Sequence, residues 1–451
     1  MSAAQNKQKS YDSLASSIRE VFSYISRFKG QLFVLKIEDT LLDNPAFPVL
    51  IRDIAQLHSV GIKILIVPGT RNSIDRQLKA YELESVFHNG IRLTSHEALP
   101  LVEQASLGAA QRILSYLTAN GISGIQGNWV QARSLGVVGG VDYMCTGKIE
   151  RIERGIIEKL LHENFIPILP PIGWNKLGHA YNISSTELAT ELCRYLAVGK
   201  LFFIGEEGGI KTDGLIRGIL TEKLELADNG LISAFDVNQA LEVLKLNPQL
   251  EYSLRDYLEN AVRACHTGAK RVHLLSGIAH GSILQEVFSS RGNGTMVYAN
   301  EYWNLRTAVI EDIPDMLRIM QNYVERGLLI SRSQEDIMEK LNDFVVYAVD
   351  NAVHGCGALH SYGDDICEIA AIAVGVNYKD SGVGEAVVNF LIEKAEKKKT
   401  KKLFLLTTQA SDWFYNFGFK DGSIEDLPKS KREIYNQKRN SKVMVMSLPL
   451  K

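Results

Sequence analysis

The order of apolar and polar positions divides the chain into short buried strands and amphipathic helices. Helical spacing of apolar residues predicts helices at residues 11–28, 49–59 and 184–198, and Ser184 with Glu187 forms a capping box at the start of the last one. Continuous apolar runs between the helices predict strands at residues 31–37, 63–67, 166–169, 200–204 and 272–275. This alternation is typical of the α/β class, in which helices cover a parallel sheet.

The pattern changes at residues 291–301, where a loop, one short strand and a polar stretch follow one another. Beyond them, Asp312 as N-cap and Gly327 as stop predict a helix. Apolar runs predict further strands at residues 305–309, 345–350, 352–359, 367–374 and 402–407. We therefore predict two domains, residues 1–298 and residues 303–451, and expect the second to be α+β.

Composition narrows the class of protein. The chain has 451 residues, of which 45% are hydrophobic and 23% charged, and its net charge of −2 argues against nucleic acid as the main partner. No apolar run reaches membrane-spanning length, and the first residues lack the apolar core of a signal peptide. The five cysteines are dispersed without metal-ligand spacing, so we expect reduced thiols in a cytoplasmic protein and no metal site.

A glycine-bearing turn joins the predicted strand at residues 367–374 to an amphipathic helix. The turn, residues 378–385, places Gly382 and Gly384 at the start of that helix. Free backbone N–H groups and the positive end of the helix dipole then face an anion, and glycine lets a phosphate approach closely. A tight turn without a ligand would have the same sequence, so the motif alone leaves both interpretations open.

The elements around this turn resemble the GNAT acetyltransferase superfamily, because a strand, a phosphate-type turn, a helix, a strand and the aromatic segment 413–419 follow in that order. The resemblance implies an acyl-CoA cosubstrate, with acetyl-CoA as the expected cofactor. It implies a pyrophosphate site at Lys379, Gly382, Val383, Gly384 and Glu385, with lysine in place of the usual Arg or Gln. It also implies backbone contacts to the pantetheine arm and the thioester carbonyl from Ile372, Ala373 and Val374.

Two residues are candidates for proton transfer. The attacking amine must lose a proton, and Glu368 on the same strand is the candidate base, acting through water. An exposed strand carboxylate without a catalytic role remains the alternative. The leaving thiolate needs a proton, but Phe414 replaces the tyrosine that GNAT domains often use. Thr407 at a strand end is the candidate to position a water or the thiol, unless the thiolate leaves unassisted.

The whole chain resembles the N-acetylglutamate synthase family, in which an amino-acid-kinase-like domain precedes a GNAT domain. Residues that carry the resemblance are 327–333, 355–359, 368–374, 403–408, 427–431 and 435–443. It implies acetyl transfer to the α-amine of L-glutamate, the first step of arginine biosynthesis. It implies that the glutamate carboxylates bind at Leu329, Arg332, Lys431, Arg439 and Ser441. The charges alone would also suit a solvated basic tail, and Ser331 replaces a frequent second arginine.

The N-terminal half resembles the amino-acid-kinase fold, an αβα sandwich, but lacks its phosphate-binding turn. Glu38 and Asp39 follow the first strand, where a glycine-rich turn is needed to hold ATP. We therefore predict that this domain is non-catalytic. The family resemblance implies that it serves regulation and oligomerisation. The resemblance implies an inhibitory arginine site at Tyr24, His273, Glu286 and Gly294, because a carboxylate suits a guanidinium. A packing tyrosine and a helix-surface acid are the alternatives.

Three functions stay open at this point. The first is synthesis of N-acetylglutamate, the second is acetylation of another amino acid or amine by the same fold, and the third is a non-catalytic sensor of arginine or acetyl-CoA. The expected partners are L-glutamate, L-arginine as an allosteric effector, and further copies of the chain. Neither nucleic acid nor a membrane is expected as a partner.

Overall fold

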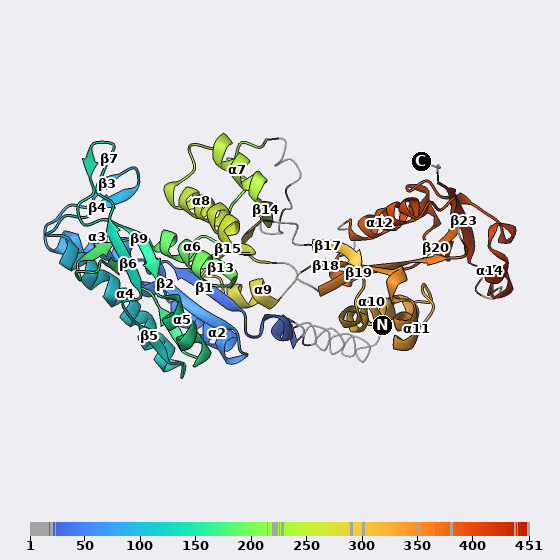
Figure 1. Ribbon diagram of the computed structural model, residues 1–451, viewed down its shortest axis with the longest axis horizontal. Coiled ribbons are helices and arrows are strands. Elements are labelled where there is room, and N and C mark those ends of the chain that lie inside the picture. The colour runs from blue at the N-terminus through green and yellow to red at the C-terminus, as the bar shows by residue number, and fades with distance from the viewer. Residues whose placement is uncertain are drawn as a thin grey trace. The chain divides into compact units, whose positions relative to one another are not determined.

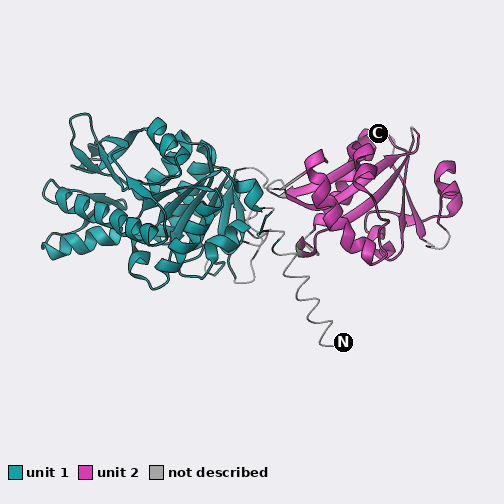
Figure 2. Cartoon of the chain, turned by 90° about the horizontal axis from the view of Figure 1, so that it is seen from below, with its two compact units in different colours: residues 1–300 teal, residues 301–451 magenta. Residues whose placement is uncertain are grey.

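The computed structural model divides into two compact units, residues 1–300 and residues 301–451, which Figure 2 shows in teal and magenta. It describes residues 18, 21–22, 24–213, 215–218, 224, 226, 230–288, 292–299, 303–349, 352–363, 365–378, 382–436, 439 and 441–448. Most of the helix predicted at 11–28 lies outside these residues. Among those described, no helix has the length and apolar character needed to cross a membrane. All five cysteines are free and buried.

The core of the first unit is an eight-stranded sheet in the order β14-β16-β15-β13-β1-β2-β10-β5 (Figure 1). Its strands are β1 (Leu32–Ile37), β2 (Lys63–Pro68), β5 (Gly124–Gln126), β10 (Ile166–Ile168), β13 (Val198–Gly205), β14 (Ala234–Asp236), β15 (Arg271–Ser276) and β16 (Thr295–Tyr298). Neighbouring strands are parallel except β15 and β16, which are antiparallel. The parallel sheet predicted from the alternation of elements is confirmed.

Helices cover both faces of this sheet because the central strands are apolar on both sides. Phe33 and Leu35 pack into one buried cluster and Val34 into the other. The first cluster also takes side chains from α2 (Phe47–Ser59), α4 (Leu99–Ala119) and α9 (Ser282–Phe288). The second takes them from α5 (Arg154–His162), α6 (Ser185–Tyr195), α7 (Val237–Leu246) and α8 (Tyr252–Thr267). The unit is therefore an αβα sandwich.

Smaller elements surround one end of the sandwich. A four-stranded sheet contains β6 (Val130–Ser134), β9 (Gly147–Ile152), β11 (Ile172–Trp174) and β12 (Ala180–Asn182). Two hairpins are formed by β3 (Val86–His88) with β4 (Ile91–Leu93), and by β7 (Val137–Val138) with β8 (Val141–Asp142). The remaining elements are the 3-10 turn η1 (Asp39–Asp43) and helix α3 (Arg71–Ala80).

The second unit is built on a seven-stranded sheet in the order β17-β18-β19-β20-β21-β23-β22. Its strands are β17 (Trp303–Thr307), β18 (Phe344–Val349), β19 (Ala352–Ser361), β20 (Ile366–Val374), β21 (Lys402–Thr407), β22 (Lys420–Asp421) and β23 (Lys442–Ser447). Only β20 and β21 pair in parallel, and the other pairs are antiparallel. This mixed sheet confirms the α+β prediction.

Helices lie on both faces of the second sheet as well. One face packs against α10 (Ile313–Glu325) and α11 (Gln334–Glu339), and the other against α12 (Val383–Lys397) and α13 (Ser411–Tyr415). The short elements are α14 (Lys429–Glu433), η2 (Ile310–Asp312), η3 (Leu341–Asp343), η4 (Val376–Tyr378) and η5 (Ile424–Asp426).

Two sequence predictions need correction. The helix predicted to reach residue 198 ends at Tyr195, because Val198 already begins the buried strand β13. Asp312 stands at the N-cap position of α10, but its carboxylate accepts the Val309 N–H at 2.8 Å and pairs with Arg306. It therefore closes the preceding turn and does not cap the helix.

Candidate active site

A cavity of about 610 Å³ opens where β20 and β21 separate. The two strands pair only from Ile366 to Glu368, and the described residues beyond these form no further pairs. Ala371 has a φ of 55°, and the pairing of β20 with β19 shifts its register beside it. Such a bulge bends a strand and increases its twist, so β20 turns away from β21 and leaves its edge facing the cavity. The edge of β20 from Ile369 to Val374 therefore lines the cavity.

The N-terminus of α12 forms one end of the cavity. Gly382, Gly384 and Glu385 line it, while Val383 is buried in the core below. Gly382 has a φ of 77°, which glycine adopts without strain. The first helical bond runs from the Ala386 N–H to the Gly382 carbonyl at 2.9 Å, so the N–H groups before it have no acceptor within the helix. This geometry can bind a phosphate. Lys379 lies outside the described residues.

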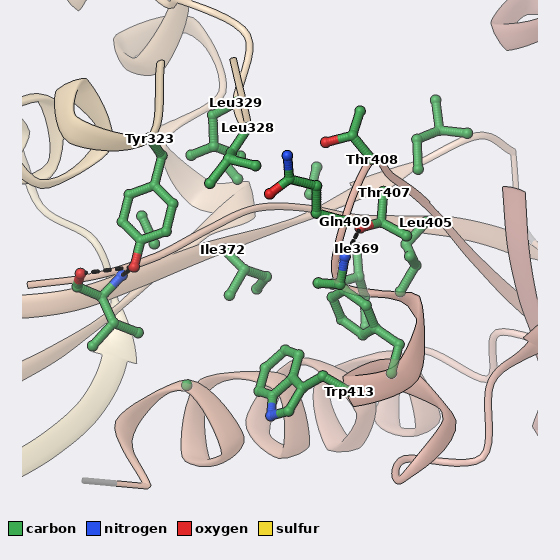
Figure 3. Close-up of a pocket in the computed structure, with 18 of the residues that line it drawn as sticks. Tyr323, Leu328, Leu329, Ile369, Ile372, Leu405, Thr407, Thr408, Gln409 and Trp413 are labelled. Carbon is green, nitrogen blue, oxygen red and sulfur yellow. Dashed lines mark hydrogen bonds between the residues drawn. The ribbon is translucent and has the colours of Figure 1, made fainter. Parts of the chain in front are cut away.

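The end of β20 forms one wall of the cavity, and Ile372, Ala373 and Val374 all line it. The Tyr323 hydroxyl, from α10, donates to the Val374 carbonyl at 3.0 Å and accepts the Val374 N–H at 3.2 Å (Figure 3). Tyr323 was not predicted from the sequence, because its position in an amphipathic helix gives no sign of a contact with a strand edge. One of the three expected backbone contacts is thus already occupied.

Thr407, at the end of β21, lies at the other end of the cavity from Tyr323 (Figure 3). Its hydroxyl oxygen accepts the Ala410 N–H at 3.0 Å, which leaves the hydroxyl hydrogen available as a donor. Phe414 also lines the cavity, as expected for a packing residue. The neighbouring Tyr415 hydroxyl bonds to Asp421 at 2.6 Å and does not line the cavity.

Glu368 is 4% exposed, so the alternative of an exposed strand carboxylate is wrong. Its carboxylate accepts a hydrogen bond from Lys431 Nζ at 2.8 Å and another from the Tyr362 hydroxyl at 2.8 Å. Burial, reinforced by this carboxylate, raises the pKa of Tyr362. Glu368 itself does not line the cavity, but Ile369, the next residue, does. The sequence analysis named Glu368 and Lys431 separately and did not foresee that they pair.

The predicted acceptor residues gather beside the cavity. Leu329 lines it directly. Arg439 donates through Nη2 to the Leu328 carbonyl at 2.7 Å, and its buried Nε has no partner among the described residues. Arg332 donates to the Ile330 carbonyl at 3.2 Å; burial lowers its pKa, and nearby Glu368 opposes that shift. Ser441 is 8% exposed. The C-terminal segment therefore contacts the loop that follows α10.

A second cluster lies in the first unit at the residues predicted to bind arginine. Glu286 is 8% exposed and accepts hydrogen bonds from His273 Nδ1 at 2.6 Å, the Asn293 N–H at 2.7 Å and the Gly294 N–H at 3.2 Å. His273 Nε2 is buried and has no partner within the described part of the chain. The alternative of a helix-surface acid is wrong.

Tyr24 joins this cluster through aromatic contacts. Its ring stacks on Phe28 at 6.0 Å between centroids, and Lys200 Nζ lies 4.9 Å from the Phe28 centroid. Burial, together with the charge of Arg271, lowers the pKa of Lys200 to about 7. His273, Glu286 and Gly294 are joined by hydrogen bonds. Tyr24 is connected to them through Phe28 and the rings of Phe33 and Phe202.

Another cavity of the first unit, about 420 Å³, lies beside the end of β1 and the start of α3. Two acidic residues, Glu38 and Asp39, follow β1 at this place. Asp39 accepts the Ser73 N–H at the start of α3, and Glu38 forms an ion pair with Lys36. A Cβ on Gly69 would lie 2.4 Å from Glu38 Oε2, so the Glu38 carboxylate packs directly against Gly69. That the unit does not phosphorylate stays a prediction.

Two known protein families match this chain, one in each unit. Residues 31–276 match the amino acid kinase family, and residues 314–419 match the acetyltransferase (GNAT) family. The chain thus joins a kinase-like unit to an N-acetyltransferase unit. It is 33% identical over 442 residues to the amino-acid acetyltransferase of Actinobacillus pleuropneumoniae serotype 7, covering 96% of this chain and 98% of the relative. The chain belongs to the amino-acid acetyltransferase family.

Further relatives agree with this assignment. The amino-acid acetyltransferase of Escherichia coli K12 is 31% identical over 448 residues, with 96% of this chain and 98% of the relative covered. The crystal structure of N-acetylglutamate synthase from Neisseria gonorrhoeae, complexed with coenzyme A and L-arginine, aligns with a TM-score of 0.82. That chain is 27% identical, and the alignment covers 96% of this chain and 99% of that one. The fused architecture predicted from the sequence is confirmed.

Proposed function

We propose that the protein transfers the acetyl group of acetyl-CoA to the α-amine of L-glutamate, giving N-acetyl-L-glutamate and CoA. The observation that carries the proposal is the cavity between β20 and β21, which has a helix N-terminus at one end and arginine side chains beside it. Two solved structures of the Neisseria gonorrhoeae enzyme, one with coenzyme A and L-arginine and one with coenzyme A and N-acetyl-glutamate, support it.

The cavity fits acetyl-CoA chemically. The N–H groups at the start of α12, which have no acceptor within the helix, suit the pyrophosphate, with Gly382, Gly384 and Glu385 at the surface, Val383 below and Lys379 nearby in sequence. The edge of β20 at Ile372 and Ala373 suits the amide-bearing pantetheine arm. The cofactor supplies the activated thioester. The residues of this chain orient it and stabilise the charges that form.

The reaction is an attack of the neutral amine on the thioester carbonyl. A backbone N–H on β20 stabilises the oxyanion, and Glu368 takes the amine proton through water because it lies just outside the cavity. The C–S bond then breaks, and the electron pair leaves with sulfur. The Thr407 hydroxyl, already accepting the Ala410 N–H, donates a hydrogen bond to the departing thiolate.

The acceptor carboxylates bind to the cationic residues beside the cavity. Arg332 and Arg439 provide guanidinium groups, and Leu329 and Ser441 complete the site. Lys431 holds Glu368 in the absence of substrate. A substrate carboxylate that reaches Lys431 competes with Glu368 for the ammonium group, which makes the carboxylate of Glu368 a better proton acceptor.

We assign residues 1–298 a regulatory and oligomerising role, with residues 303–451 as the catalytic domain. L-Arginine is the proposed effector, because the Glu286 carboxylate and the unpartnered His273 Nε2 are both acceptors for a guanidinium. Tyr24 and Gly294 complete this site. We further propose a cytoplasmic homo-oligomer. The cytoplasmic location is supported by five unpaired cysteines, which are usual in a reducing compartment.

A steady-state assay tests this proposal. CoA release is measured with each of the amino acids as acceptor, with and without L-arginine. The proposal predicts turnover with L-glutamate well above that with the other amino acids, and a change in that rate when arginine is present. Turnover with a different amine but not with glutamate would favour another acceptor. Acetyl-CoA binding without turnover would favour a sensor.

A further inference from the structure

The Tyr323 hydroxyl occupies part of the free edge of β20. It bonds to both backbone polar groups of one residue, the Val374 carbonyl at 3.0 Å and the Val374 N–H at 3.2 Å. Both distances are within the normal range for hydrogen bonds. One side chain from α10 therefore satisfies the two groups that a neighbouring strand would otherwise satisfy.

These two groups face the cavity because of the strand geometry. The Gly375 N–H donates to the His354 carbonyl of β19 at 2.7 Å, and successive residues of a strand direct their backbone groups to opposite sides. Val374 therefore points away from β19, to the side where β21 pairs only as far as Glu368. Without Tyr323, the Val374 groups would form an open strand edge in the cavity.

An open strand edge binds extended chains that carry amide groups, which add to it as a further strand. The arm of acyl-CoA is such a chain, since it contains two amides between the phosphates and the thioester. From the start of α12 to Thr407 it has to pass along the cavity wall that Ile372 and Val374 form. Figure 3 shows Tyr323 and Thr407 at opposite ends of this path, with Ile372 between them.

We propose that the Tyr323 hydroxyl competes with acyl-CoA for the Val374 N–H and C=O: it holds both groups in the free protein and leaves them when the arm of acyl-CoA binds. The cofactor amide replaces the hydroxyl at the same two backbone atoms. The proposal rests on the proposed function, because it requires acyl-CoA in this cavity.

Tyr323 also connects the cofactor side to the acceptor side. Its backbone carbonyl accepts the N–H groups of Leu328 at 2.8 Å and Leu329 at 3.2 Å. The Leu328 carbonyl in turn accepts Arg439 Nη2 at 2.7 Å. Tyr323 therefore contacts the cofactor wall through its side chain and the acceptor loop through its backbone carbonyl.

The test is CoA binding to the full chain by calorimetry, with Tyr323→Phe and Tyr415→Phe compared with the wild type. Tyr323→Phe removes the competing hydroxyl but keeps the ring, so CoA should bind about three- to ten-fold more tightly, the range expected for one hydrogen bond. KM for acetyl-CoA should fall by the same factor while kcat stays within about two-fold. Tyr415→Phe removes a hydroxyl bonded to Asp421, outside the cavity, and should leave CoA binding unchanged.

Equal or weaker CoA binding by Tyr323→Phe would overturn the proposal, because the hydroxyl would then remain bonded in the complex. No CoA binding by the wild type would instead overturn the proposed function, and this inference with it. Thermal unfolding gives a second measurement, and Tyr323→Leu a second variant. The free variants should unfold at a lower temperature than the wild type, and saturating CoA should raise their unfolding temperature by more.

Discussion

Each unit places a helix N-terminus beside the ends of parallel strands, but the two are used differently. In the first unit, the N–H of Ser73 at the start of α3 donates to Asp39, and Lys36 is paired with Glu38. In the second unit, Gly382 and Gly384 leave the start of α12 facing a cavity. In the first unit, the Asp39 carboxylate thus occupies the N-terminus of α3. In the second unit, the N-terminus of α12 remains accessible to a ligand.

The difference shows that the side chain beside a helix N-terminus, a carboxylate or a glycine, decides whether its N–H groups bind the chain itself or remain open to a ligand. A carboxylate there has the same charge as a phosphate and forms the same hydrogen bonds, so it excludes the ligand while stabilising the helix. Glycine leaves the N–H groups unpaired and gives a phosphate room to approach. This contrast explains why acetyl transfer is assigned to the second unit alone.

The largest expected effect on KM comes from placing a carboxylate at the start of α12. Gly384→Asp introduces at the start of α12 the charge that Asp39 has in the first unit. A Cβ at Gly384 would lie 3.4 Å from the Trp413 ring, so the change fits the fold. KM for acetyl-CoA should rise by about 100-fold or more, because a negative charge at the cavity wall opposes the pyrophosphate and each 1.4 kcal/mol is ten-fold.

The chain offers a matched control for this variant. Gly155 is the second residue of α5, as Gly384 is of α12, and a Cβ there meets nothing within 4 Å. Gly155→Asp should leave KM for acetyl-CoA unchanged. If Gly155→Asp raised KM as much as Gly384→Asp, the added charge would act regardless of its position. The proposed pyrophosphate site at the start of α12 would then lose its support.

The next largest effect concerns the acceptor. Arg439→Ala removes a guanidinium proposed to bind a substrate carboxylate, which is worth about 1.5–3 kcal/mol and corresponds to roughly a 10- to 100-fold rise in KM for glutamate. KM for acetyl-CoA should change little. Arg432→Ala, in the same segment but exposed, is the control. An unchanged glutamate KM in Arg439→Ala would count against the assigned carboxylate site.

A smaller effect, on stability, is expected from removing the Asp39 carboxylate at the start of α3. Asp39→Ala removes the acceptor of the Ser73 N–H and should lower the stability of the first unit by about 0.5–2 kcal/mol, as for other helix caps. Asp39→Asn, which keeps an acceptor oxygen, should recover part of the loss. The free energy of unfolding of both variants and the wild type is measured by denaturant titration with circular dichroism. Equal stability of all three proteins would mean that Asp39 does not serve as a cap.

A dependence of stability on pH is expected in the arginine cluster. Burial, with the charge of Lys200, lowers the pKa of His273 from 6.5 to about 4. Burial opposes ionisation of Glu286, but the hydrogen bond from His273 and nearby charges outweigh it and lower its pKa from 4.5 to about 2. Both groups bind fewer protons folded than unfolded, so stability is present at neutral pH and falls as pH drops below about 6.5.

Unfolding at a series of pH values measures this effect. The free energy of unfolding of the first unit should fall by roughly 1–3 kcal/mol between pH 7 and pH 4. His273→Asn removes one of the titrating groups and should weaken the dependence. A variant with the same pH dependence as the wild type would show that His273 does not titrate in this range.

The fold could be predicted from the sequence where the hydrophobic pattern fits only one kind of element. Buried parallel strands such as β1 and β13 are continuous apolar runs, and their positions were predicted to within two residues. Asp312 was misassigned, because a carboxylate near a helix start has the same sequence signature whether it closes the preceding turn or caps the helix. Periodicity does not distinguish these two hydrogen bonds.

The candidate site could be predicted only in part, for a physical reason. Gly382, Gly384 and Thr407 lie at a turn and at a strand end, so their spacing in sequence places them at one cavity. The Glu368–Lys431 pair and the contact of Tyr323 with Val374 join segments far apart in sequence. Such contacts depend on packing between elements, and no local pattern of residue types encodes them.

The most direct test of the central claim is the product formed by the purified full chain from acetyl-CoA and L-glutamate, measured by mass spectrometry beside the release of CoA. The account predicts N-acetyl-L-glutamate in equal amount to the CoA released, with both lost in Gly384→Asp at acetyl-CoA concentrations that saturate the wild type. CoA release without N-acetyl-L-glutamate, or equal product formation by Gly384→Asp, would contradict it.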